Sequence, residues 1–106
     1  MATQQDRASL ADDVLVRRAQ RGDMSAFEEL VTRHRDKIYA RAFSMMRNED
    51  EAVDLSQEAW VKGWQRLKQF QGESSFLTWM TRIVNSRWFQ AFLRPIFAKH
   101  LTLATR

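Results

Sequence analysis

The sequence has no cysteine, one proline, three glycines and only two histidines among its 106 residues. The absence of cysteine excludes disulfides and thiolate metal sites, and His34 and His100 are too far apart to suggest a zinc site. So few turn-forming residues disfavour an all-β fold. No apolar run approaches the roughly 20 residues of a membrane span, and the first residues lack the apolar stretch of a signal peptide. These absences predict one all-α domain in the cytoplasm.

Charge and aromatic residues are unevenly distributed along the chain, whose net charge is +4. Residues 48–61 carry five acids and no base, whereas residues 74–106 carry five bases and no acid. Nine of the twelve aromatic residues lie between positions 60 and 97. Basic segments interleaved with rings are typical of single-stranded nucleic-acid binding, because each stacked base contributes roughly 1–3 kcal/mol. The pattern indicates either two solvated helix faces or two partners of opposite character, the basic segment binding nucleic acid.

Hydrophobic spacing predicts a compact bundle of about four helices over residues 9–95. A disordered tail is expected at residues 1–8 and an irregular tail at residues 96–106. The helices are expected over about 9–21, 24–47, 49–67 and 76–95.

Capping residues define the helix boundaries. Ser9, Asp23, Asn48 and Ser75 each suit an N-cap position. Pro95 is expected to end or kink the fourth helix.

The third predicted helix has two distinct faces at 100° per residue. The face expected to be buried consists of Val53, Ser56, Trp60, Trp64 and Leu67, flanked by Ala52 and Gly63. The face expected to point outward consists of Asp54, Gln57, Glu58, Val61 and Gln65.

The fourth predicted helix loses its apolar pattern partway along. Its first turns carry Phe76, Trp79, Met80 and Ile83 on one face, but beyond Val84 basic residues fall where core residues belong. The aromatic residues that follow scatter over the other faces. This end of the helix therefore makes unusual contacts or is poorly ordered, and self-association through its aromatics is one way to cover them.

No catalytic arrangement is present. The sequence lacks a glycine-rich phosphate loop, and its acids form no nucleophile or metal motif. His34 lies between Arg33 and Arg35 on a helix, which suits a half-buried helix residue better than a base. We expect no enzymatic activity, no cofactor and no metal.

Four stretches in a fixed order carry a resemblance to a known family. They are DDVLVRRAQRGDMSAFEELVTRHRDKIY (12–39), EAVDLSQEAWVKGW (51–64), FQGESSFLTW (70–79) and TRIV (81–84). Together they resemble region 2 of bacterial sigma-70 family sigma factors of the extracytoplasmic-function (ECF) type. The resemblance covers roughly residues 10–84.

The resemblance implies a partner for the outward face of the third helix. In the family this helix docks on the clamp helices of the largest subunit of core RNA polymerase. The implied contact residues are Asp54, Gln57, Glu58, Val61 and Gln65. Carboxylates and amides there suit basic partner helices, because charge-assisted hydrogen bonds are short and directional.

The resemblance also implies a DNA-binding surface. Family members open the promoter −10 element and hold a flipped non-template base in the loop before the fourth helix, which requires a pocket that restores stacking and edge hydrogen bonds. The implied residues are Phe70, Gln71, Gly72, Glu73, Ser74, Ser75, Trp79, Arg82, Asn85 and Ser86. Several have structural alternatives: Phe70 and Trp79 as core residues, and Ser75 as a helix cap.

The sequence departs from the family pattern at two places. A gapless alignment puts Ser86 where members carry Asn and Arg87 where they carry an apolar residue, whereas a one-residue gap restores Asn85 only. Family members also continue into a second helical domain that reads the −35 element, and residues 96–106 do not resemble it, so that domain is expected to be absent.

Three functions remain open. The chain is a sigma domain that binds core polymerase and opens the −10 element; or a truncated or degenerate module that binds polymerase or an anti-sigma factor without productive promoter reading; or a generic helical DNA-binding regulator. No helix-turn-helix signal supports the third.

Overall fold

The structure is a computed structural model and describes residues 9–104. Within this range the chain contains helices and no strand, so the all-α prediction is confirmed. The elements are α2 (Asp12–Gln20), α3 (Met24–Met46), α4 (Glu49–Arg66), the 3-10 turn η1 (Leu67–Gln69), α5 (Phe76–Trp88), the π-helical turn η2 (Phe89–Leu93) and α6 (Arg94–Ala104). The predicted tail at 1–8 lies outside the described residues. None of the described helices is both long enough and apolar enough to cross a membrane.

Local hydrogen bonds set most helix boundaries. The side chains of Asp23, Asn48 and Ser75 accept backbone N–H groups two or three residues further on, at 3.0–3.3 Å, so these three predicted N-caps are confirmed. The first helix differs, because α2 begins at Asp12 and its N-cap, Ala11, makes no side-chain capping bond. The prediction of Ser9 as an N-cap is therefore wrong.

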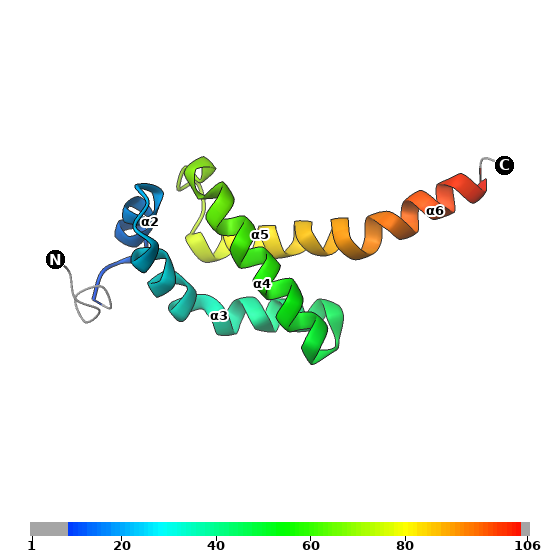
Figure 1. Cartoon of the computed structure of the whole chain (residues 1–106), viewed down its shortest axis with the longest axis horizontal. Helices are drawn as coiled ribbons and strands as arrows, with labels where there is room; N and C mark the ends of the chain where they lie inside the picture. The colour runs from blue at the N-terminus through cyan, green and yellow to red at the C-terminus, as the bar shows by residue number, and fades with distance from the viewer. Residues whose placement is uncertain (1–8, 105–106) are drawn as a thin grey trace.

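Helices α2 to α5 form the predicted four-helix bundle, in which α3 contacts α2, α4 and α5 (Figure 1). Phe27 of α3 lies in its aromatic centre. The Phe27 ring centroid is 5.1 Å from that of Trp64, 5.9 Å from that of Trp60 and 6.4 Å from that of Phe76. Edge-to-face packing of this kind joins α3, α4 and α5 into one core.

The buried face of α4 overlaps the predicted one but is rotated from it. Its buried residues are Ala52, Leu55, Ser56, Ala59 and Gly63, of which Ala52, Ser56 and Gly63 were expected there. Val53, expected to be buried, is 40% exposed. The small residues bring the neighbouring helices close: a Cβ on Gly63 would lie 2.6 Å from Met80 Sδ of α5. Trp60 and Trp64, also expected on the buried face, are half-buried.

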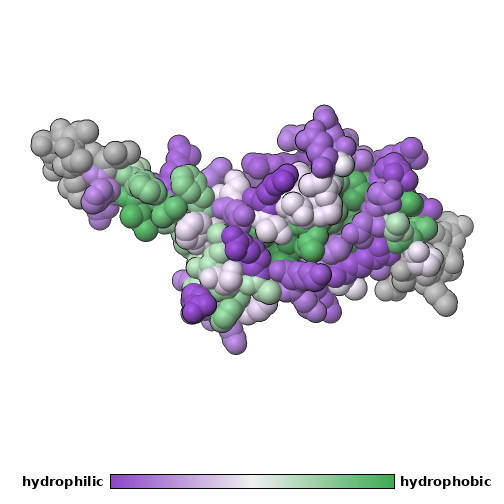
Figure 2. Space-filling model, turned by 180° about the vertical axis from the view of Figure 1, so that it is seen from behind, coloured by the Kyte–Doolittle hydropathy of each residue, from purple (hydrophilic) through white to green (hydrophobic). Residues whose placement is uncertain are grey.

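The chain remains helical beyond the expected end of the domain, so the irregular tail predicted for residues 96–106 is wrong up to residue 104. In η2 the backbone N–H of Arg94 donates to Phe89 O, five residues back, and Pro95 lies in the next turn, where helices tolerate proline. The resulting α6 points away from the bundle, and the molecule is 62 Å long but 28 Å wide (Figure 1). Hydrophobic residues gather on this extension (Figure 2), where Phe89, Phe92, Ile96 and Phe97 are exposed.

Candidate functional site

The five residues predicted for polymerase docking lie together on α4 and are all exposed. We call Asp54, Gln57, Glu58, Val61 and Gln65 the α4 face. They line one hollow of about 460 Å³. The structure adds two residues that the sequence analysis did not include in this surface, Lys62 of α4 and Arg87 of α5.

Arg87 connects the end of α5 to the α4 face. Its Nη2 donates to Glu58 Oε2 at 2.9 Å, and its side chain is 24% exposed. Its Nε is buried and makes no hydrogen bond. With Asp54 and Glu58 as acids and Lys62 and Arg87 as bases, the hollow has no net formal charge.

The loop at residues 70–75 is the predicted DNA-binding segment, and it is anchored at both ends. Phe70 is half-buried, with its ring centroid 5.1 Å from that of Trp79 and 6.3 Å from that of Phe76. At the other end Ser75 Oγ accepts from Thr78 N–H at 3.1 Å. Phe70, Trp79 and Ser75 therefore hold the loop in place, as their structural alternatives predicted.

The residues between these anchors are presented to solvent. Gln71, Gly72 and Glu73 are exposed, and Ser74 is half-buried with its Oγ donating to Ser75 O at 3.1 Å. Gly72 has a φ of +76°, a left-handed conformation that glycine adopts without strain. The backbone there can thus approach a ligand closely.

Two hollows lie on either side of the loop. The smaller, about 100 Å³, contains Trp79 and Arg82 of α5, so the structure brings these two predicted residues together with the loop. Its lining is Gln69, Phe70, Gln71, Glu73, Ser74, Trp79 and Arg82. The larger, about 460 Å³, lies between the loop and α2 and is lined from α2 by Asp12, Asp13, Val16, Arg17 and Gln20.

Gln20 of α2 fixes the start of the loop. Its Nε2 donates to Leu67 O at 2.9 Å and to Phe70 O at 2.8 Å. Both carbonyls belong to the turn that leads into the loop. Gln20 could not be predicted as a site residue, because a glutamine that bonds to backbone groups 47 and 50 positions away leaves no local signal in the sequence.

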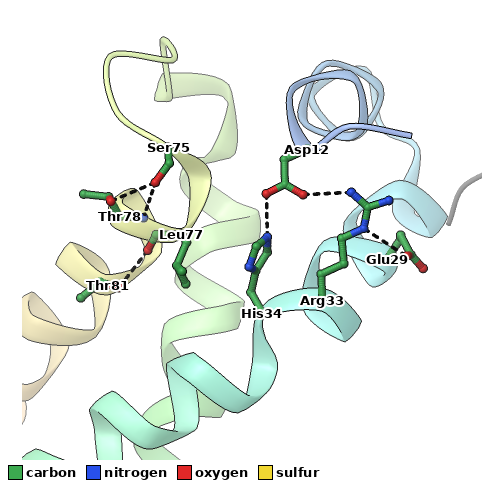
Figure 3. Close-up of polar contacts among 8 residues, drawn as sticks. All are labelled: Asp12, Glu29, Arg33, His34, Ser75, Leu77, Thr78 and Thr81. Atoms are coloured by element: carbon green, nitrogen blue, oxygen red, sulfur yellow. Dashed lines mark hydrogen bonds and ion pairs between the residues drawn. The ribbon is translucent and has the colours of Figure 1, made fainter. Parts of the chain in front are cut away.

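A different polar contact, made by Asp12, holds α2 against α3. Asp12 points between two consecutive α3 side chains (Figure 3), with His34 Nε2 2.7 Å from Asp12 Oδ2 and Arg33 Nη1 3.0 Å from Asp12 Oδ1. Arg33 also donates from Nε to Glu29 at 3.2 Å. His34 therefore acts here as a structural helix residue.

Two predicted DNA-binding residues lie apart from the loop. Asn85 and Ser86 are half-buried in the third turn of α5 and line neither hollow beside the loop. Asn85 Oδ1 accepts from Arg41 Nε of α3 at 3.0 Å. Its carboxamide oxygen is thus already engaged within the bundle.

No group of three or more histidine, aspartate or glutamate side chains in residues 9–104 is arranged to hold a metal ion.

Comparison with known proteins identifies the family. Residues 30–94 match the family model for sigma-70 region 2. The chain is 42% identical over 72 residues to RNA polymerase sigma-H factor of Pseudomonas aeruginosa, covering 68% of this chain and 37% of that protein. It is 42% identical over 74 residues to ECF RNA polymerase sigma-E factor of Escherichia coli K12, covering 70% and 38%. The chain thus spans less than two-fifths of the length of these relatives.

Two solved structures share the fold. One is an engineered region 2 of sigmaE in complex with GTAAAA, with a TM-score of 0.67, 34% identity, and 82% of this chain and 85% of that chain covered. The other is CnrH in complex with the cytosolic domain of CnrY, with a TM-score of 0.68, 30% identity, and 89% and 60% covered. The chain belongs to the sigma-70 family, as a region 2 domain of the ECF type.

Proposed function

We propose that this chain binds core RNA polymerase through the α4 face and recognises and melts the promoter −10 element through the 70–75 loop, in the cytoplasm. Sigma factors are initiation factors and not enzymes, in agreement with the expected lack of catalysis. The observation that carries the proposal is the division of the surface into two separate parts. The α4 face surrounds one hollow, and an exposed loop with hollows on both sides forms the other part.

The loop has the features that a single DNA strand requires. The Gln71 carboxamide can pair with a base edge, Gly72 permits close backbone approach, and the exposed Arg82 can neutralise a phosphate. The relative solved with GTAAAA supports this assignment. The non-template strand of the −10 element is the proposed ligand.

A direct test is the binding of fluorescein-labelled single-stranded GTAAAA, followed by anisotropy with and without core polymerase. We expect Gln71→Ala to weaken binding roughly fivefold or more, since a good side-chain-to-base pair contributes about 1–3 kcal/mol. Gln90→Ala removes an exposed glutamine outside both surfaces and serves as the matched control. Equal affinity of the two variants would contradict the assignment of the loop, and preferential binding to duplex DNA without core would favour a generic DNA-binding regulator.

The second candidate function is an interaction module that binds polymerase, or an anti-sigma factor, without productive promoter reading. The Arg41–Asn85 hydrogen bond favours it, because it engages the carboxamide oxygen of a residue that the family resemblance assigns to DNA binding. CnrH, solved with the cytosolic domain of CnrY, supports a protein partner of this kind. This function would be identified if the chain binds core polymerase but its affinity for GTAAAA is no higher with core polymerase than without it.

A further inference from the structure

Arg87 is a charged residue at a position where the sequence pattern calls for an apolar one. Its side chain is three-quarters buried, yet its guanidinium reaches across to α4 and lines the hollow of the α4 face. Within residues 9–104, one of its donors has an acceptor: Nη2 bonds to Glu58. A guanidinium carries five N–H donors in a fixed fork, so most of its capacity is unused by this contact.

The ion pair with Glu58 does not by itself account for the position of Arg87. The Glu58 side chain is 52% exposed, and exposed ion pairs stabilise folded proteins little. The contact uses a single nitrogen, although guanidinium and carboxylate bind most strongly when two parallel bonds form. The pair can therefore open or change partner when another molecule covers the hollow.

The charge of the hollow specifies the chemistry of that molecule. An exclusively acidic face would fit a purely basic helix, but here Asp54 and Glu58 are balanced by Lys62 and Arg87. A purely basic partner would place like charges next to Arg87, which lowers affinity. A partner surface that carries an acidic side chain beside a basic one can pair with both the bases and the acids of the hollow.

We propose that Arg87 contacts core polymerase directly, by pairing with an acidic side chain of the docking helices while Asp54 pairs with a basic one. This inference rests on the proposed docking of the α4 face. It differs in adding a residue of α5 and an acidic partner group to a contact otherwise made by α4.

A double-mutant cycle separates direct contact from an effect through Glu58. Affinity for core polymerase is measured for the wild-type chain, Glu58→Ala, Arg87→Ala and the double variant, with Arg35→Ala as an exposed arginine control and circular dichroism to verify folding. We expect Arg87→Ala to weaken binding about tenfold in both backgrounds, as for the loss of one charge-assisted hydrogen bond.

Three outcomes overturn this inference: an unchanged affinity of Arg87→Ala, tighter binding of that variant, or a loss that disappears in the Glu58→Ala background. The last would show that Arg87 acts only by holding Glu58. Failure of the wild-type chain to bind core polymerase would instead overturn the proposed function, and this inference with it.

Discussion

Replacing Asp12 by alanine removes the carboxylate that joins α2 to α3. This side chain is 35% exposed and accepts from Arg33 and His34, whose side chains are 22% and 16% exposed. The same helix turn holds Asp13, which is 72% exposed and makes a 3.4 Å ion pair with Arg17. The two neighbouring aspartates therefore allow the same substitution to be compared at a half-buried and at a solvated position.

The expected magnitudes follow from this difference in environment. A hydrogen bond to a charged group contributes about 1.5–3 kcal/mol, and Asp12 makes two that share one partly exposed carboxylate, so we expect Asp12→Ala to lower the free energy of unfolding by about 2–3 kcal/mol. Asp13→Ala loses only an exposed helical ion pair, about 0.3–0.5 kcal/mol. Both variants lose the same favourable interaction with the helix N-terminus, about 0.3–1 kcal/mol.

Thermal and urea unfolding followed by circular dichroism measure both variants. For a domain of this size, Asp12→Ala is expected to lower Tm by roughly 10 °C and Asp13→Ala by a few degrees. Equal shifts in Tm would contradict this expectation, because they would show that the contacts to Arg33 and His34 add nothing beyond the helix-terminal charge.

Three further changes test other parts of the structure. Gly63→Val should lower the free energy of unfolding by about 1–3 kcal/mol in urea titrations, because a Cβ would meet Met80 Sδ at 2.6 Å; unchanged stability would contradict the close contact of α4 and α5. Gln20→Ala frees the start of the 70–75 loop and should weaken GTAAAA binding while core binding persists; equal loss of both would show a general folding defect. If the exposed aromatics of the extension mediate self-association, sedimentation should show a concentration-dependent dimer that the double variant Phe92→Gln/Phe97→Gln abolishes; a monomer at all concentrations would refute it.

Short-range features were predictable from the sequence. The caps at Asp23, Asn48 and Ser75 depend on bonds to residues two or three positions away, so residue type and spacing define them. The outward position of the α4 face also follows from helical periodicity alone. In each case the determining interaction lies within a single helix turn or a single helix.

Features decided between helices were not predictable. The buried stripe of α4 passes through Leu55 and Ala59 and not through Val53, because the small residues of α4 allow α5 to approach closely. The contribution of Gln20 to the loop depends on a contact across the bundle. Arg87 interrupted the apolar pattern, and its position beside the α4 face depends on a contact between α5 and α4.

The helical extension shows that Pro95 does not end the helix. Proline is expected to break or kink a helix, but the π-helical turn at residues 89–93 widens the helix directly before Pro95. The helix therefore continues as α6, with its apolar residues carried away from the bundle.

Docking through the α4 face is tested by titration of core RNA polymerase with the 106-residue chain. The wild-type chain is compared with Asp54→Ala/Gln57→Ala and with Asp36→Ala/Gln90→Ala, a matched pair of exposed residues outside the proposed surfaces. We expect saturable binding that the first double variant weakens at least tenfold, because charge-assisted hydrogen bonds are lost. The second double variant should bind as the wild-type chain does. Equal affinities of all three proteins, or no binding by the folded wild-type chain, would contradict docking through the α4 face.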